Sequence, residues 1–593
     1  DEEKWSTIAG ARGGAQGCVL APIVFGFGSL TPYRNIDTFL KPKDNALFGA
    51  YLDDCVISAA HADTIEAFTI FQRDGPKHGM EINYGKNKTV VLLGKCANEE
   101  DKEQRIAAYT AKGLPLSNIK IHPDNGGQPE EYGYIHLGVP VGSTDFQFQH
   151  LHQLVTKFIA TGECDEAVDE AHEKWVYLLW VTRQKFPFWF RHMCPSLTST
   201  VEDRIESHMR RKFDTVLGQL TQDREWVQAC LPTKNHGCGL GRTSDIIASA
   251  FAANVEETMA AVKKKLPATQ AYMDMLHAAT DIFDAHLFPS DDIRRFIMYA
   301  REKKKIVIDA ASHLFELPAL TAYDSDTTSR KMKTQHLYSD FINRSRAKEM
   351  ELLIMDHGSE ADRARFLSNN GSLAGAWLFN IPKDKHSTMS SPEFRCALKL
   401  RLGADFHTLP THCCCPQKTR VCPKAIHLFS CNEMKPFLLQ RHNAIKDVVM
   451  QLARCAGFRA TDSGLGRIIE EDGRQGDTLF SGLGRGGKDL VADYCIANAC
   501  APSYVRNSCS TEGFAMKRLE TNKYRKYQAL YYRAGVDFVP LAMEMHGAIT
   551  DTFLKFLKKL ASAAAKQSDI PYCIVFSYWQ RRVSTTLQKL NAR

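Results

Sequence analysis

Two adjacent aspartates, Asp53 and Asp54, stand between two apolar segments of the chain. Paired carboxylates at the tip of a strand hairpin offer oxygen ligands to hard divalent cations, which can hold the attacking and leaving oxygens of a phosphoryl transfer. An Asp-Asp pair is also common in ordinary turns, because aspartate stabilises turns through local hydrogen bonds. The interpretation of this pair therefore depends on what the neighbouring segments supply.

Five of the 18 cysteines lie between Cys413 and Cys431, together with His427. Zinc takes four cysteine or histidine ligands in a tetrahedron, and clustered cysteines without a secretory leader favour a metal site over a disulfide framework. Cys413-x-Cys415 followed by His427-x-x-x-Cys431 supplies four ligands, and Cys422 could replace one of the first pair. The alternative is a group of buried free thiols. We expect a structural Zn²⁺ that serves folding and nucleic-acid binding and not catalysis.

Acidic and basic residues gather again toward the end of the chain. Asp477 follows Arg-Gln-Gly, Asp493 follows Leu-Val-Ala, and Lys523 and Lys526 lie in the run Lys-Tyr-Arg-Lys-Tyr. Acidic residues on adjacent strands with a nearby lysine can bind Mg²⁺, activate a water and stabilise the charge on a scissile phosphate. The alternative is a set of ordinary surface residues in an α/β domain.

Four segments around the aspartate pair resemble, in order and spacing, successive palm motifs of reverse transcriptases, most nearly those of non-LTR retroelements. They are Gly-Gly-Ala-Gln-Gly-Cys-Val-Leu-Ala-Pro at 13–22, Tyr-Leu-Asp-Asp at 51–54, Gly-Met-Glu-Ile-Asn with the following lysines at 79–89, and Tyr-Ile-His-Leu-Gly-Val-Pro at 134–140. The resemblance implies that Gln16 and Gly17 line the template and nucleotide site. It also implies that Asp53 and Asp54 belong to the metal site, with Asp53 as the direct ligand.

The same resemblance implies roles for residues farther along. A lysine would lie beside the incoming triphosphate; Asn-x-x-Lys selects Lys86, whereas Lys-Thr selects Lys88. The Leu137-Gly138 turn would grip the primer. The other metal-binding aspartate of these enzymes belongs to a strand before the Gln-Gly motif, where this sequence has nothing to supply it. Because two-metal chemistry needs a cage of carboxylates, we expect an incomplete polymerase.

The Cys/His cluster leads into Arg441-His442-Asn443 and then into the acidic segments. This order resembles the restriction-like endonuclease that follows a Cys-Cys-His-Cys knuckle in some non-LTR retroelements. The resemblance implies that Asp477 and Asp493 bind Mg²⁺ or Mn²⁺. It makes Lys523 or Lys526 the catalytic lysine and places His442 near the site. The family usually has proline before the first aspartate, where this chain has glycine.

Apolar periodicity predicts the elements that position these residues. Residues 1–150 predict mixed α/β structure, with strands near 47–58, 89–93 and 132–141. A helix with an apolar stripe stands where a thumb would follow the palm; the stripe is Val201, Ile205, Met209, Phe213 and Val216. Residues after 435 predict helices alternating with short strands to about 560, including a buried strand after Asp537 and a closing helix at 551–565.

We therefore predict a multidomain α/β fold. Its parts are a partial reverse-transcriptase palm, a helical thumb, a helical linker, a zinc knuckle and a restriction-endonuclease-like α/β domain. The predicted boundaries are 1–150, 151–250, 251–404, 405–435 and 436–593.

The composition is that of ordinary globular protein, with 44% hydrophobic and 24% charged residues among 593. A net charge of +7 supports nucleic-acid partners only weakly. The longest nearly apolar run, Cys18 to Leu30, is too short to span a bilayer. Since the first residue is Asp1 and no leader follows, we interpret the chain as a fragment. We expect a nuclear protein, cytoplasmic in transit, that contacts DNA and RNA and no membrane.

Two functions remain open from the sequence. One is a retroelement-derived chain that keeps a metal-dependent DNA endonuclease beside an incomplete polymerase. The other is a catalytically inactive remnant that only binds nucleic acid. A third possibility is a decaying pseudogene product that does nothing for its host.

Overall fold

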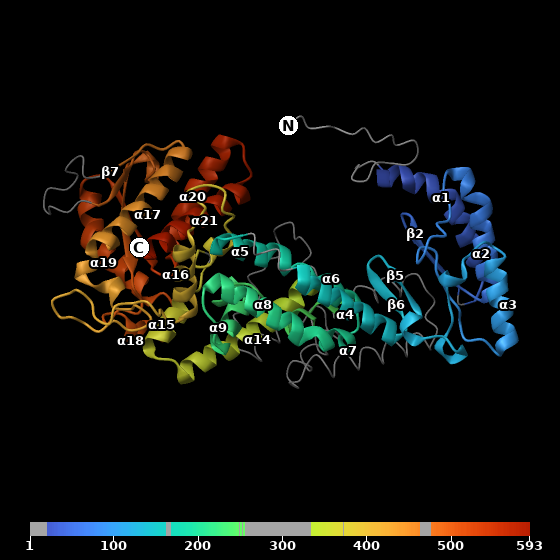
Figure 1. Ribbon diagram of the computed structural model, residues 1–593. Coiled ribbons are helices and arrows are strands. Elements are labelled where there is room, and N and C mark those ends of the chain that lie inside the picture. The colour runs from blue at the N-terminus through green and yellow to red at the C-terminus, as the bar shows by residue number, and fades with distance from the viewer. Residues whose placement is uncertain are drawn as a thin grey trace, which may run out of the picture. The chain divides into compact units, whose positions relative to one another are not determined.

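The computed structural model (Figure 1) describes residues 21–44, 46–161, 168–247, 249–251, 253–254, 334–371, 373–462 and 476–592. It is mixed α/β, as predicted, with long helices and small sheets. The chain clusters into two compact units, residues 1–157 and 158–593. Among the residues described, none of the helices combines the length and apolarity that crossing a bilayer requires.

The first unit packs two helices beside a β-hairpin. Helices α1 (Ala21–Leu40) and α2 (His61–Asp74) meet around Ile36, Leu40, Ala67 and Ile70. Strands β1 (Leu47–Tyr51) and β2 (Asp54–Ser58) pair antiparallel, with Tyr51 opposite Asp54. The predicted segment 47–58 is therefore a hairpin.

The remainder of the first unit contains two more pairs of short strands. β3 (Val91–Leu92) pairs in parallel with β4 (Ile119–Lys120), and Tyr109 of α3 (Glu99–Thr110) packs into their core. β5 (Gly133–His136) and β6 (Val139–Gly142) form a second hairpin. Helix α4 (Thr144–Thr161) crosses from the first unit into the second. The strands predicted near 89–93 and 132–141 both form, although the former is short.

The second unit begins with a helical layer. α8 (Glu202–Leu217) buries its whole predicted apolar stripe, including Val201 directly before it, and packs against α5 (Ala171–Tyr177) and α16 (Ser391–Leu402). Residues predicted as thumb and as linker thus share one core. Further helices of this layer include η6 (Leu178–Thr182), α6 (Phe186–His192), α7 (Pro195–Thr198), α9 (Asp223–Cys230), α14 (Thr334–His357) and α15 (Glu360–Ser368).

A mixed four-stranded sheet, in the order β10-β9-β8-β7, lies in the last part of the chain. Its strands are β7 (Ala460–Asp462), β8 (Thr478–Phe480), β9 (Leu490–Ala497) and β10 (Asp537–Glu544). β8 runs antiparallel to β7 and β9, whereas β9 and β10 are parallel. A parallel pair needs a crossover connection, and here α19 (Phe514–Arg533) supplies it, after the short α18 (Val505–Ser508).

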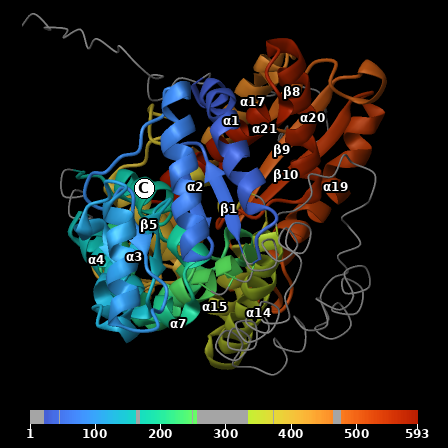
Figure 2. The same cartoon turned by 90° about the vertical axis from the view of Figure 1, so that its right-hand side faces the viewer.

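Helices cover both faces of this sheet. Figure 2 shows α19 on one side, with α17 (Lys435–Cys455) and α21 (Tyr572–Asn591) on the other. α20 (Asp551–Ser568) joins the core of α17 and α21 and is the closing helix predicted at 551–565. The sequence pattern did not predict α21, which buries Trp579 in the same core.

Alternation along β9 decides which side chains meet which helix. Ala492 and Tyr494 belong to the core of α17, α20 and α21, whereas Val491 packs with Tyr527 and Tyr531 of α19. Since successive residues of a strand point to opposite faces, Asp493 points toward α19.

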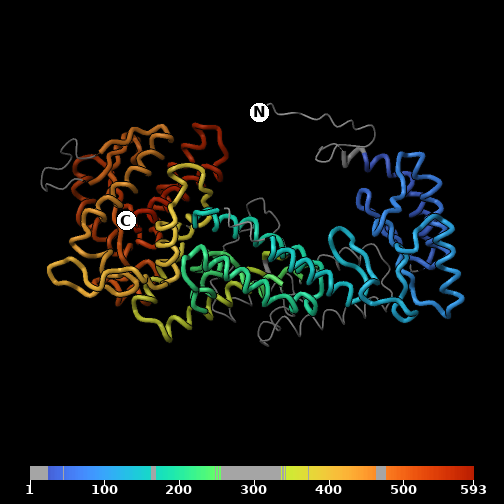
Figure 3. The backbone as a smooth tube through the Cα atoms, viewed as in Figure 1, coloured from blue at the N-terminus to red at the C-terminus, as the bar shows by residue number. Residues whose placement is uncertain are grey.

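A stretch without long helices, residues 403–434, connects the helical layer to the sheet. It contains the short turns η11 (Leu428–Ser430) and η12 (Asn432–Met434) and ends where α17 begins; it lies in the yellow-to-gold part of the tube in Figure 3. The predicted Cys/His knuckle therefore lies directly before the helix that covers one face of the sheet.

A buried histidine joins the start of the helical layer to its end. His172 Nε2 donates to the Asn380 carbonyl at 2.9 Å, and the Met389 amide donates to Nδ1 at 3.2 Å. One ring nitrogen donates and the other accepts, so these bonds require the neutral ring. Burial lowers the pKa of His172 to about 4.

We predict that His172 makes the second unit less stable in mild acid. An unfolded histidine takes up a proton near pH 6.5, whereas folded His172 stays neutral down to about pH 4. Between these values the unfolded state binds more protons, so stability falls with falling pH by up to about 1.4 kcal/mol per pH unit from this group. Urea unfolding measured across this window should show a shallower slope in His172→Gln. The exposed control His357→Gln should keep the full slope, and equal slopes in all three proteins would contradict the prediction.

Candidate functional site

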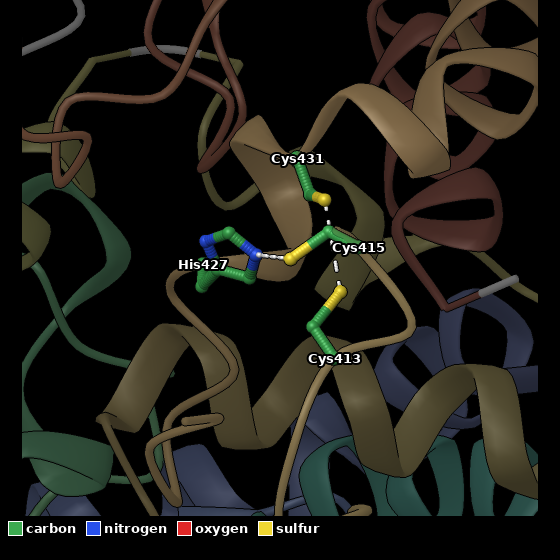
Figure 4. A group of neighbouring side chains, drawn as sticks. All are labelled: Cys413, Cys415, His427 and Cys431. Atoms are coloured by element: carbon green, nitrogen blue, oxygen red, sulfur yellow. Dashed lines mark hydrogen bonds between the residues drawn. The ribbon is translucent and has the colours of Figure 1, made fainter. Parts of the chain in front are cut away.

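Four side chains of the predicted knuckle converge on one point (Figure 4). Cys413, Cys415, His427 and Cys431 offer ligand atoms that all lie within 4.8 Å of one another. The Sγ atoms of Cys413 and Cys431 are 3.6 Å apart, and Sγ of Cys415 is 3.6 Å from Nε2 of His427. Three thiols and one imidazole are a donor set that suits tetrahedral zinc. The cluster can therefore hold a metal such as zinc.

A tight hairpin places the first two cysteines. The Cys413 amide donates to the Thr419 carbonyl at 2.9 Å, and the Lys418 amide donates to the Cys415 carbonyl at 2.8 Å. His427 and Cys431 lie at the two ends of η11. Hydrogen bonds from the Thr419 amide and hydroxyl lower the pKa of the Cys415 thiol to about 6, and His427 acts in the same direction. The thiolate, which is the form that binds metal, is thus favoured there.

Cys422 lies outside this group. Its Sγ accepts a hydrogen bond from the Ile426 amide at 3.4 Å. Of the ligand sets that the spacing allowed, the structure assembles the one that contains Cys413 and Cys415. Cys414, between these two, is exposed.

We predict that the purified chain carries one Zn²⁺ in this cluster. His427→Ala and Cys431→Ser should each lower the zinc content measured by elemental analysis, because three ligands hold the ion less well than four. Cys414→Ser and Cys422→Ser are the matched controls and should leave it unchanged. Zinc retained by the first pair of variants, or lost from the second pair, would exclude this ligand set.

Asp53 and Asp54 lie at the exposed tip of the β1–β2 hairpin, as expected. Leu52 and Asp53 form the two-residue turn, and Leu52 has a φ of 56°. The Tyr33 hydroxyl donates to the Leu52 carbonyl at 2.7 Å. Burial raises the pKa of Tyr33, and the two nearby aspartates act in the same direction. The hairpin thus holds two carboxylates close to one phenol and open to solvent.

The other residues implied by the palm resemblance lie on separate turns. Lys86 and Lys88 are exposed before β3, and Gly138 lies with Leu137 in the turn between β5 and β6. Both residues of that turn have positive φ, 50° at Leu137 and 81° at Gly138, which glycine adopts without strain. In the described part of the first unit, no hydrogen bond or ion pair joins these residues to the aspartate pair. Gln16 and Gly17 lie outside the described residues.

Asp493 and Lys523 form an ion pair beneath α19. Nζ of Lys523 lies 2.7 Å from one carboxylate oxygen of Asp493 and 3.0 Å from the other. The Asp493 side chain is 7% exposed and that of Lys523 is 31% exposed. The pair forms because strand alternation turns Asp493 toward α19, whose buried side carries Lys523.

Asp477 and His442 meet at the neighbouring position. Oδ2 of Asp477 accepts hydrogen bonds from Nε2 of His442 at 3.1 Å and from the Tyr494 amide at 2.7 Å. The same His442 nitrogen is 3.0 Å from the Tyr494 carbonyl. Asp477 directly precedes β8, and its own amide donates to the Ala492 carbonyl at 2.8 Å. Its carboxylate therefore continues the β8–β9 ladder beyond the end of the strand.

The two aspartates and two bases influence one another's charge. Burial raises the pKa of Asp493, and Asp477 raises it further while Lys523 opposes the rise. Burial works against the charged forms of His442 and Asp477, yet their mutual hydrogen bond raises the pKa of His442 and lowers that of Asp477. Despite burial, Asp493 raises the pKa of Lys523. The charged forms of Lys523 and His442 are therefore favoured by the carboxylate that each contacts.

The structure explains why a glycine, Gly476, precedes Asp477. A Cβ at Gly476 would lie 2.5 Å from Cγ1 of Val491, closer than real contacts allow. The Gly476 amide also donates to the Tyr531 hydroxyl at 2.7 Å, a bond that proline could not make. Gly476 therefore suits the place where the resembled family has proline.

The structure distinguishes the two candidate lysines. Both ammonium groups lie over the Tyr527 ring, that of Lys526 at 4.8 Å and that of Lys523 at 5.5 Å from its centroid, but Lys523 also contacts Asp493. Sequence reasoning missed Tyr531, whose hydroxyl holds the Gly476 backbone. Tyr527 and Tyr531, spaced four apart in an otherwise charged helix, were the available signal for a buried side of α19.

Comparison with known proteins does not identify the chain: no family model matches it, and no curated protein does.

Proposed function

We propose that this chain is part of a non-LTR retroelement polyprotein and that its last region is a metal-dependent DNA endonuclease. The observation that carries the proposal is the meeting of Asp477, Asp493 and Lys523. They come from the start of β8, from β9 and from α19, and they meet across adjacent strands. Two carboxylates with a lysine beside them are the groups that metal-assisted cleavage of a phosphodiester requires.

The donor set fits Mg²⁺ or Mn²⁺, because hard cations prefer carboxylate oxygens. Asp477 and Asp493 would hold the ion, which would supply a nucleophilic hydroxide and polarise the scissile phosphate. Lys523, kept protonated by Asp493, stabilises the negative charge that builds on the phosphate oxygens. His442 and the Tyr494 amide fix the orientation of Asp477 through its Oδ2.

The knuckle and the aspartate hairpin support the wider proposal by their order along the chain. A palm-like hairpin with Asp53 and Asp54, a Cys/His cluster and an acidic centre follow one another as in the resembled retroelement proteins. In such a chain the endonuclease nicks chromosomal DNA, and reverse transcription is primed from the nick. A finer assignment of the fold, as palm, thumb, knuckle and restriction-endonuclease-like domain, is part of the same proposal.

We predict that the chain nicks supercoiled DNA in Mg²⁺ or Mn²⁺. Asp477→Ala, Asp493→Ala and Lys523→Met should each lower the nicking rate by about 100-fold or more, the usual effect of losing a preorganised charged group. Lys526→Met should retain most of the activity, because the lysine bonded to Asp493 is Lys523. Loss of nicking in Lys526→Met with retention in Lys523→Met would reverse this assignment.

One observation favours the second candidate, an inactive nucleic-acid-binding remnant. Both carboxylate oxygens of Asp493 are bound by Lys523, so a cation must compete with an ammonium for the same ligand. A remnant would bind DNA with the same affinity whether or not Asp493 is replaced, and it would not nick DNA in either metal. Circular dichroism of each variant separates loss of the site from loss of the fold.

We predict that this chain alone does not extend a primer on an RNA template. Within the described residues, the Cys/His cluster is the one set of three or more potential ligands that lie together. Asp53 and Asp54 therefore have no third carboxylate grouped with them in the described part of the chain, and two-metal polymerisation needs a fuller cage. Primer extension by the chain, abolished by Asp53→Ala, would refute this.

A further inference from the structure

The side of α19 that faces away from the sheet carries a concentration of positive charge. Four exposed cations make up this basic face: Lys517, Arg518, Arg525 and Arg533. The single carboxylate of the helix, Glu520, is half-buried. In the part of the chain that the structure describes, no ion pair joins Arg518, Arg525 or Arg533 to an acidic residue.

Polar side chains and a hollow accompany the cations. A surface hollow of about 420 Å³ lies beside the first half of α19, and Thr521 and Asn522 line it together with three of the cations. The guanidinium of Arg518 lies over the Phe514 ring, 5.9 Å from its centroid, and Lys517 donates to the Glu512 carbonyl at 3.3 Å. Aromatic and backbone contacts thus hold two cations in place without neutralising them.

We propose that this basic face binds the phosphate backbone of duplex DNA on the flank of the cleavage site. From Lys517 to Arg533 the helix rises by about 24 Å, at 1.5 Å per residue. That length spans about seven base pairs of duplex, which carry a phosphate charge about every 1.7 Å of axis. A face of unpaired guanidinium groups complements such a row of phosphates in charge and in hydrogen-bond donors.

The geometry separates this face from the chemistry. At about 100° per residue, Arg525 and Arg518 leave the helix about 160° and 140° away from Lys523. Lys523 points to Asp493, so the arginines point away from the aspartates across a helix about 10 Å wide. Arg518 and Arg525 therefore hold phosphates other than the one that is cut, and they contribute to binding and not to the cleavage step. The inference rests on the proposed endonuclease for its placement of the cleavage site, although binding can be measured without cleavage.

The test compares two double variants with the same change in charge. Arg518→Gln/Arg525→Gln removes two cations of the basic face. Lys555→Gln/Lys558→Gln removes two exposed cations of α20, whose apolar side packs on the opposite face of the sheet. Anisotropy of a labelled duplex is measured without added Mg²⁺ or Mn²⁺, so that no cleavage occurs, from about 50 to 200 mM salt.

The expected result is specific to the first variant. Its affinity for duplex should fall by about tenfold, and the slope of log K against log salt should become shallower by about 2, since each lost phosphate contact removes about 0.9. The α20 variant should bind as the unaltered chain does. In Mg²⁺, the rate of nicking at saturating DNA should be unchanged in the first variant, because only binding is altered.

The outcomes separate this inference from the proposed endonuclease. An unaltered salt slope and affinity in Arg518→Gln/Arg525→Gln would overturn the basic face, even in a chain that nicks DNA. The expected slope change in a chain that never nicks would keep the basic face as a DNA-binding surface and remove the endonuclease. An equal loss of affinity in the α20 variant would overturn the assignment of DNA binding to this face. The single variant Arg525→Gln, with a smaller expected slope change of about 1, tests the result again if the double variant does not fold.

Discussion

Asp493 and Lys523 are the charges on which the geometry of the last region depends. Asp493 lies in the central strand β9 with a side chain that is 7% exposed, and an unpaired carboxylate there would cost several kcal/mol. Its partner comes from α19, so the crossover between β9 and β10 must pass over this face of the sheet. Tyr531 of α19 stacks on Phe538 of β10, with ring centroids 5.2 Å apart, and so packs the crossover against the strand that follows it.

Hydrogen bonding to β9 explains why Asp477 lies directly before β8 and not within it. β8 is three residues long, and the Asp477 carboxylate accepts the Tyr494 amide that a longer β8 would have met with its backbone. Because Gly476 has no side chain, the backbone can approach Val491 closely enough for Asp477 to make this hydrogen bond. The position of Asp477 is thus determined by backbone hydrogen bonding as much as by charge.

The sequence predicted the parts of the structure that local pattern controls. The apolar stripe from Val201 to Val216 is periodic enough to identify α8, and ligand spacing limited the cluster around Cys415 to five candidates, of which the structure excludes Cys422. It could not choose between Lys523 and Lys526, because both lie in one charged run and only the buried side of α19 distinguishes them. Strand alternation places Asp493 opposite α19, but the pairing of Asp493 with Lys523 is a long-range contact that no local pattern encodes.

The knuckle (Cys413, Cys415, His427 and Cys431) is connected to the site of Asp477 and Asp493 through the chain and through a hydrogen bond. Cys431 precedes α17 by a few residues, and His442 lies seven residues into that helix, about 10 Å along its axis. Asn498, the first residue after β9, donates to the Ser430 hydroxyl at 2.9 Å within the knuckle. The knuckle is thus attached both to the helix that carries His442 and to the strand that carries Asp493. Since binding energy at a structural metal site is folding energy, a metal held by the four knuckle ligands would stabilise the two elements whose spacing sets the His442–Asp477 contact.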